Sequence, residues 1–229
     1  MKILAIGAHP DDIEIFMFGL LLICAKRGDD IGLIVATDGA AGNVLSNDNL
    51  KLIRMEETII ALRKLGKPEF LGFSDGNLSS DNNAIKTLST KIKLHNPDLI
   101  ITHAPEDYHP DHRALSYFVT QATGFICPVI FCDTLMGINF QPEIYIDISS
   151  VFDQKEEAIL AHKSQSPKKF LRAARLMNRY RSAQCNDIED NFAEAYRHQK
   201  SFPFSDVRSL LPLAPKINQY YKNKETSFI

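Results

Sequence analysis

Two short segments of this sequence combine histidine and aspartate around a proline: Ala8–Asp12 (AHPDD) and His109–His112 (HPDH). In each, the proline suits the first position of a helix, where its missing N–H costs nothing. The acids that follow would lie at the positive end of the helix dipole, which favours the ionised carboxylate by about 0.3 to 1 kcal/mol. Imidazoles beside ionised carboxylates can hold a divalent metal ion or transfer a proton, so both segments are candidates for catalysis.

The spacing within the two segments favours one shared metal ion. His9 and Asp12 are three residues apart, so one helical turn can bring both side chains to the same side, and His112 has in the second segment the place that Asp12 has in the first. If the segments are neighbours in space, these three residues form the ligand set of a catalytic zinc site with an open fourth position. Nickel, cobalt, manganese and iron accept the same ligands, so zinc is inferred from ligand type. Either segment alone could equally be a helix cap.

The surrounding elements would place both segments directly after buried strands. Continuous apolar strands separated by helical patterns predict an α/β fold with a mostly parallel sheet and helices on both faces. In such sheets ligands bind beyond the carboxyl ends of the strands. The predicted strands are Lys2–Gly7, Asp30–Thr37, Glu69–Phe73, Asp98–Thr102, Val129–Cys132 and Glu143–Ile148, and the predicted helices Asp12–Arg27, Leu50–Leu65 and Ala84–Leu94.

The chain from Ser150 onward is predicted to be mainly helical and more polar. It shows no internal repeat and no convincing linker. We therefore expect residues 1–229 to form a single domain, with a peripheral tail from about residue 205.

Composition narrows the class of protein. A net charge of -2 gives no electrostatic reason to expect nucleic acid or an anionic membrane as a partner. No segment reaches the roughly 18 to 20 apolar residues needed to span a bilayer, and acids precede the apolar run Ile15–Ala25 where an export signal needs positive charge. The four cysteines form no CxxC pair and suit buried thiols in a reducing compartment. We expect a cytoplasmic protein.

The motifs together resemble the PIG-L/LmbE-like N-acetyl-sugar deacetylase family. The resemblance rests on AHPDD after a strand, TDG at Thr37–Gly39, HPDHR at His109–Arg113 and the helix Arg54–Gly66, and it covers about residues 2 to 200. AHPDDIEI, IDIS and HKSQ are most similar to the bacillithiol-pathway deacetylases, which act on N-acetylglucosamine joined to malate. The resemblance implies a Rossmann-like sheet, one Zn2+ per chain and removal of an N-acetyl group from a small amino-sugar derivative, free, nucleotide-linked or otherwise conjugated. It leaves a homo-oligomer open. The absence of GxGxxG after the first strand argues against a dinucleotide cofactor.

The resemblance also implies roles for single residues. His9, Asp12 and His112 match the metal ligands and Asp11 the general base. His109 matches a residue that stabilises the oxyanion and can act as an acid. The remaining matches are Asp111 as a carboxylate that orients a neighbouring histidine, and Arg54 and Asp75 as contacts to the sugar.

The sequence departs from the pattern just before the second segment. Some relatives have a tyrosine two residues before the HPDH histidine, where this chain has Asp107, so Tyr108 is the candidate substrate contact there.

Several weaker signals have two interpretations. Arg54 and Glu57 have the spacing of an ordinary ion pair on a helix. Asp38 could hydrogen-bond a metal-bound histidine or simply form a turn, and Asp75 could contact a sugar hydroxyl or form a turn. His103 could line the site or lie behind it. The other open candidates are His162 as a pocket residue and Arg172, Arg175, Arg179 and Arg181 as a basic face for an anionic group.

Rival functions are a metal-bound sugar-binding or regulatory protein without turnover, and another metal-dependent hydrolase acting on an amide or a phosphoester. A phosphoesterase with two metals usually needs more bridging carboxylates than these segments offer. A free carboxylate such as that of Asp11 beside the metal favours turnover over binding alone.

Overall fold

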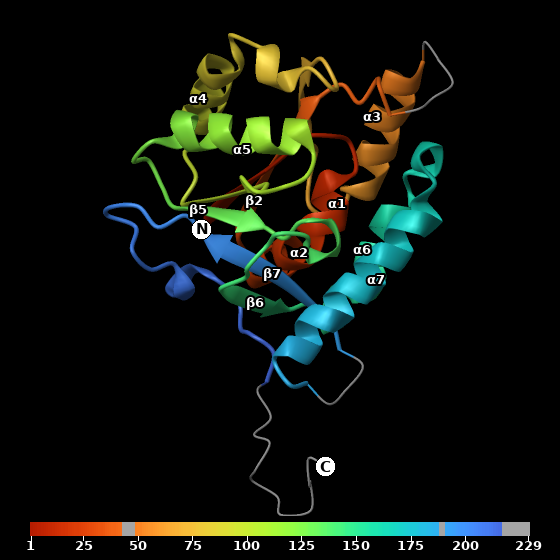
Figure 1. Ribbon diagram of the computed structural model, residues 1–229, viewed down its shortest axis with the longest axis vertical. Helices are drawn as coiled ribbons and strands as arrows, with labels where there is room; N and C mark the ends of the chain where they lie inside the picture. Colours follow the sequence, from red (N-terminus) through yellow and green to blue (C-terminus); the bar gives the residue numbers. More distant parts are fainter. Residues whose placement is uncertain (43–48, 188–190, 217–229) are drawn as a thin grey trace, which may run out of the picture.

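Figure 1 shows a computed structural model of the chain, which describes residues 1–42, 49–187 and 191–216. Seven strands in this part of the chain form one sheet in the order β3-β2-β1-β4-β5-β7-β6. The pairs that join the first five strands are all parallel, and β7 runs antiparallel to both of its neighbours. The strands are β1 (Lys2–Gly7), β2 (Asp30–Thr37), β3 (Glu69–Phe73), β4 (Leu99–Thr102), β5 (Val129–Cys132), β6 (Ile144–Asp147) and β7 (Ala193–His198).

Helices cover both faces of the sheet, as the continuous apolar strands predicted (Figure 1). Alternate residues of a strand enter different cores: Ile3 of β1 packs into one and Leu4 into the other. One face carries α1 (Asp12–Phe16), α2 (Phe18–Arg27), α3 (Leu50–Ala61), α6 (Phe152–Leu160) and α7 (Pro167–Gln184), and the other carries α4 (Ala84–His95) and α5 (Pro110–Thr123).

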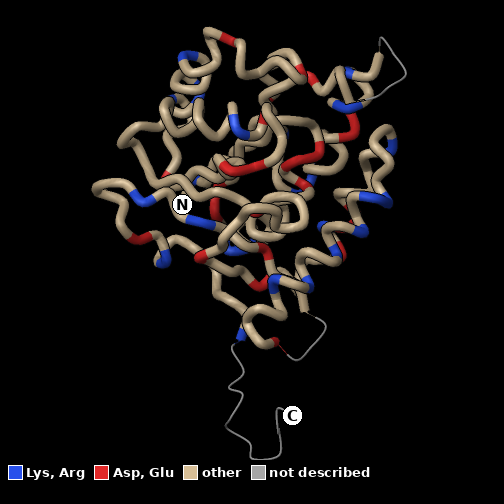
Figure 2. The backbone as a smooth tube through the Cα atoms, viewed as in Figure 1, with Lys and Arg blue, Asp and Glu red and all other residues tan. Residues whose placement is uncertain are grey.

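Short 3-10 turns complete the described secondary structure. They are η1 (Leu78–Ser80), η2 (Leu135–Gly137), η3 (Ser149–Val151), η4 (Lys163–Gln165) and η5 (Arg208–Leu210). Basic and acidic residues are interspersed along the chain (Figure 2), in keeping with the net charge of -2.

The strand order reverses between β1 and β4, which are hydrogen-bonded neighbours with Ala5 opposite Ile101. In open α/β sheets this switch point leaves a crevice beyond the carboxyl ends of the two strands. The loop after β1 carries residues 8–12 and the loop after β4 leads to residues 109–112. The topology therefore brings the two histidine-containing segments to the same edge of the sheet.

The helix predicted over Asp12–Arg27 is interrupted at Met17, whose φ of -131° and ψ of -12° are not helical. A buried carboxylate stabilises the second helix that begins there. Glu194 of β7 accepts hydrogen bonds from the backbone N–H groups of Gly19 (2.9 Å) and Leu20 (2.8 Å). These N–H groups of the first turn have no partner within the helix, so the distant carboxylate caps it.

The chain after Ser150 was predicted to be mainly helical, and the largest departure from that prediction is the strand β7, which lies between β5 and β6 in the sheet. Its sequence AEAYRH is too polar to predict a buried strand. The structure compensates for that polarity, because Lys155 donates to Glu194 at 2.6 Å with both side chains buried. α6 and α7 agree with the helical prediction.

The chain after about residue 205 was predicted to be peripheral. Val207 is buried in the core beside α2, and Leu210 and Leu211 pack against the same core. Residues 217–229 of the predicted tail lie outside the described residues. Within the described parts of the chain, no helix combines the length and apolarity needed to cross a membrane.

Candidate active site

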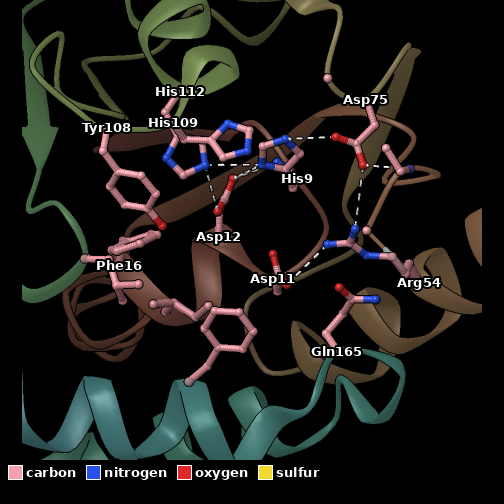
Figure 3. Close-up of a pocket in the computed structure, with 16 residues that line it drawn as sticks. His9, Asp11, Asp12, Phe16, Arg54, Asp75, Tyr108, His109, His112 and Gln165 are labelled. Atoms are coloured by element: carbon pink, nitrogen blue, oxygen red, sulfur yellow. Dashed lines mark hydrogen bonds and ion pairs between the residues drawn. The ribbon is translucent and has the colours of Figure 1, made fainter. Parts of the chain in front are cut away.

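Three side chains converge at the switch point (Figure 3). Nδ1 of His9 lies 3.2 Å from Nε2 of His112 and 3.3 Å from Oδ2 of Asp12, and Nε2 of His112 lies 3.3 Å from Oδ1 of Asp12. Donor atoms that bind a tetrahedral ion at about 2.0 to 2.1 Å are about 3.3 to 3.4 Å apart. The two ring nitrogens have the separation of donor atoms around one ion, each lies at that separation from a different oxygen of Asp12, and all three side chains are buried.

Nearby carboxylates fix how the two rings present their nitrogens. Nδ1 of His112 lies 3.1 Å from Asp107, and Nε2 of His9 lies 3.2 Å from Asp75 and 3.3 Å from Asp111. A ring nitrogen must carry the proton to donate to its carboxylate. If it does so in both rings, Nδ1 of His9 and Nε2 of His112 face each other with lone pairs. Lone pairs at this separation repel unless a cation lies between them. The donor set therefore fits a divalent metal ion.

Other groups of side chains around the centre also have donor spacing, and each shares a residue with the first set. They are His9, His109 and His112; Asp12, His103 and His112; and His9, Asp75 and Asp111. His103 is fully buried behind the site, with Nε2 3.1 Å from Asp12 and its ring stacked on that of His112 at 3.8 Å. Burial lowers the pKa of His103. The side chain lies behind Asp12 and is not among the residues that line the pocket.

Asp11 lies beside the donor set and faces the same pocket. Its φ of 123° is outside the range that L-residues ordinarily adopt, which costs about 1 to 3 kcal/mol. Burial raises the pKa of Asp11 to about 6, although the positive charge of Arg54, with Nη2 3.2 Å from Oδ2, lowers it in part. A carboxylate with this pKa can both accept and return a proton near neutral pH.

Arg54 positions Asp11 and does not pair with Glu57 as the helix spacing allowed. Its guanidinium donates to the carbonyl oxygens of Gly39 (2.9 Å) and Pro10 (2.7 Å), and only 3% of the residue is exposed. Glu57 instead accepts hydrogen bonds from the N–H and hydroxyl of Ser164. Arg54 thus connects α3 to the loops after β1 and β2.

Asp75 is held by protein groups on two sides. Oδ1 lies beside His9, and Oδ2 accepts the N–H of Ala41 at 3.0 Å and lies 3.8 Å from Arg54. Burial alone would raise its pKa, but the hydrogen bond and charge of His9 outweigh burial and lower it. Asp38 forms a turn, accepting the N–H groups of Ala40 and Asp75, and it contacts no histidine among the residues that the structure describes.

His109 and Asp111 interact through the backbone of Asp111 and not through its carboxylate. The Asp111 carboxylate contacts His9 and accepts the N–H groups of Gly76 (2.7 Å) and Leu78 (3.2 Å), whereas its own N–H donates to Nδ1 of His109 at 3.2 Å. This bond leaves the proton of His109 on Nε2. Burial lowers the pKa of His109, which favours the neutral imidazole as the donor.

The pocket in front of these groups has a volume of about 290 Å3. Tyr108 lines it with half of its surface exposed, next to His109. Several other residues that line the pocket had no predicted role: Ile15, Phe16, Leu135, Gln165 and Phe170. Asp107 was not predicted as the partner of His112, although an acid two residues before the HPDH segment was the signal for it.

The remaining sequence candidates lie outside this pocket. His162 is buried and pairs with Glu14 at 2.8 Å. Arg181 forms a buried ion pair with Asp133 at 2.6 Å, and Arg175 pairs with Glu156, so these two arginines do not act together as one free basic face.

The fold and the site together define a Rossmann-like α/β protein with a histidine–aspartate donor set at its switch point. The chain matches the family described as "PIG-L: GlcNAc-PI de-N-acetylase" over residues 4–123, a range that includes both segments, and it belongs to this family of deacetylases.

Two of the similar proteins are named as deacetylases. The chain is 29% identical over 188 residues to the diacetylchitobiose deacetylase of Thermococcus kodakarensis, covering 72% of this chain and 70% of that protein. It is 29% identical over 185 residues to the probable N-acetyl-alpha-D-glucosaminyl L-malate deacetylase 2 of Bacillus cereus, covering 72% and 83%. The 4-carboxy-2-hydroxymuconate hydratase of Pseudomonas putida superposes with a TM-score of 0.76 over 86% of this chain and 95% of that one. At 19% identity that likeness shows the fold alone.

Proposed function

We propose that this protein removes the N-acetyl group from an N-acetylglucosamine derivative with a zinc ion held by His9, Asp12 and His112. The observation that supports this most is the carboxylate of Asp11, which faces the pocket beside the donor set and is held there by Arg54 despite its strained backbone. A protein that only bound a sugar would not need this carboxylate. The names of the relatives support an acetylated amino sugar as the substrate class.

The metal, when bound, polarises the amide carbonyl and lowers the pKa of water toward about 7. Asp11 takes a proton from the attacking water, whose oxygen forms the new bond to the carbonyl carbon. The Nε2–H of His109 donates a hydrogen bond to the developing oxyanion. The C–N bond then breaks as the amine accepts a proton, for which Asp11 and His109 are the two candidate donors.

The chain's other residues orient the reactants. Asp107 and Asp111 hold the two imidazoles, so that their free nitrogens face the reaction centre. Arg54, Asp75 and Tyr108 line the pocket, and we propose that they contact the sugar.

Acetate release from a panel of N-acetylated sugars, measured with zinc-loaded and with chelator-treated protein, tests the proposal. We expect release only with metal. Asp11→Asn should retain the metal and lose release. If no sugar released acetate from zinc-loaded protein, the alternative of a metal-bound sugar-binding or regulatory protein would replace ours.

A cytoplasmic location is also proposed, supported by four free cysteines, of which Cys24, Cys127 and Cys132 are buried. Assembly into a homo-oligomer stays a prediction, which sedimentation of the purified protein would test.

A further inference from the structure

The pocket has two chemically different walls. Arg54, Asp75 and Gln165 form a polar wall. The side chains of the other wall are apolar or aromatic, and we call them the apolar wall: Ile15, Phe16, Tyr108, Leu135 and Phe170. Figure 3 shows Phe16 and Tyr108 on the opposite side of the histidines from Arg54 and Gln165.

The apolar wall is backed by the main core of the protein. Ile15 and Phe16 are 3% and 4% exposed and belong to that core, and Leu135 and Phe170 are partly buried against it. These side chains come from α1, η2 and α7, three elements that pack together. Ile15 and Phe16 thus form the floor of the wall, and a ligand group that covered the still accessible parts of Leu135, Phe170 and Tyr108 would remove apolar surface from water.

Apart from the proposed metal ion, the pocket has few positively charged groups. Arg54 is the sole lysine or arginine among the described residues that line it, and both of its terminal nitrogens are engaged by the protein. Its Nε has no hydrogen-bond partner but is buried. Asp11, Asp12 and Asp75 also line the pocket. An anionic group on the substrate would therefore meet no uncommitted cationic side chain there, and its desolvation would go uncompensated.

We propose that the substrate is a neutral glycoside of N-acetylglucosamine whose aglycone is apolar or aromatic and lies against the apolar wall. This inference rests on the proposed function and narrows it. Of the sugars that the sequence leaves open, it disfavours the malate-linked and nucleotide-linked ones, because both carry negative charge.

Three glycosides of N-acetylglucosamine with the same anomeric configuration test the proposal: methyl, phenyl and malyl. The aglycone is not the leaving group of N-deacetylation, so differences in kcat/KM report its binding in the pocket. We expect kcat/KM for the phenyl glycoside to be about tenfold higher than for the methyl glycoside. It should also be at least about tenfold higher than for the malyl glycoside, in line with discrimination by an apolar pocket.

A charge placed in the apolar wall provides the reciprocal test. Phe170→Arg, and independently Leu135→Arg in case the first variant folds poorly, should raise the ratio of malyl to phenyl kcat/KM by about fivefold through an added ion pair. Leu176→Arg is the matched control, because Leu176 is on the same helix as Phe170 but exposed and outside this pocket. It should leave the ratio unchanged.

The outcomes separate the two proposals. If the wild-type protein used the malyl glycoside as well as the phenyl one, the neutral aglycone would be ruled out while deacetylation stood. If none of the three released acetate, and the wider panel also failed, the proposed function would fall and this inference with it.

Discussion

Oδ2 of Asp107 lies 3.1 Å from Nδ1 of His112, while Oδ1 of the same carboxylate accepts the backbone N–H of His109 at 2.8 Å. One buried side chain thus orients the ring of a candidate metal ligand and holds the backbone of His109, the N-cap residue of α5. Burial alone would raise the pKa of Asp107, but the hydrogen bond and charge of His112 outweigh it and keep the carboxylate ionised.

Asp107→Asn should therefore weaken metal binding. The amide offers His112 a poorer acceptor, and loss of such a partner typically lowers metal affinity about 10- to 100-fold. Competition with a chromogenic chelator measures the change. Asp98→Asn, at the amino end of β4 and away from the pocket, is the matched control. Equal affinities for the two variants would show that Asp107 does not support the ligand.

His109→Ala and His112→Ala should separate catalysis from metal binding. Loss of an oxyanion donor costs about a hundred- to a thousandfold in kcat, so we expect His109→Ala to keep zinc and lose most turnover. His112→Ala should lose both. Elemental analysis measures the zinc content of each variant, and acetate release measures its turnover. If His109→Ala lost zinc and His112→Ala kept it, the ligand assignment would be wrong.

The buried pair of His162 and Glu14 predicts a pH dependence of stability. Burial alone would lower the pKa of His162, but Glu14, with Asp11 and Glu57 beyond it, outweighs burial and raises it above 6.5. The folded protein then holds this proton more tightly than the unfolded chain does. The resulting stability is fully present below about pH 6.5, the unfolded pKa, and is lost as pH rises through the higher folded pKa.

Urea unfolding at a series of pH values measures this dependence. We expect the free energy of unfolding of the wild-type protein to fall as pH rises above about 6.5. His162→Gln and Glu14→Gln should both flatten this part of the curve. A variant whose curve kept the wild-type slope would mean that another group causes it.

The buried pair of Lys155 and Glu194 should be costly to break. Glu194→Gln leaves the Lys155 ammonium buried without a counter-charge and weakens the cap of α2, so we expect a loss of about 3 to 5 kcal/mol in the free energy of unfolding. Chemical denaturation measures it. Glu157→Gln, which breaks the exposed pair with Lys64, should have a much smaller effect. Similar losses for the two would contradict the role given to Glu194.

The parallel half of the sheet was predictable because buried parallel strands are continuous apolar runs. β1, β2, β3 and β5 have the predicted bounds. The convergence of His9, Asp12 and His112 followed from one topological rule, that neighbouring parallel strands end at the same edge.

What escaped prediction depends on tertiary partners. The polar strand β7 is stable in the sheet because Lys155 neutralises Glu194, and these two residues are 39 positions apart. The apolar wall escaped because Phe16, Leu135 and Phe170 have no chemical signature and come together only in the folded chain. The partner of Asp111 was unpredictable for the same reason, since His9 is 102 residues away.

The insertion of β7 between β5 and β6 has a consequence for how the protein is made. Every candidate metal ligand and candidate catalytic residue has been synthesised by position 112, yet the carboxylate that caps α2 belongs to residue 194. A nascent chain that has not yet reached this residue leaves one edge of β5 and two N–H groups of α2 unpaired. Although a fragment that ends before β7 would carry every candidate metal ligand, we expect it to fold less stably than the longer chain, because it lacks the cap of α2 and the strand that pairs with β5.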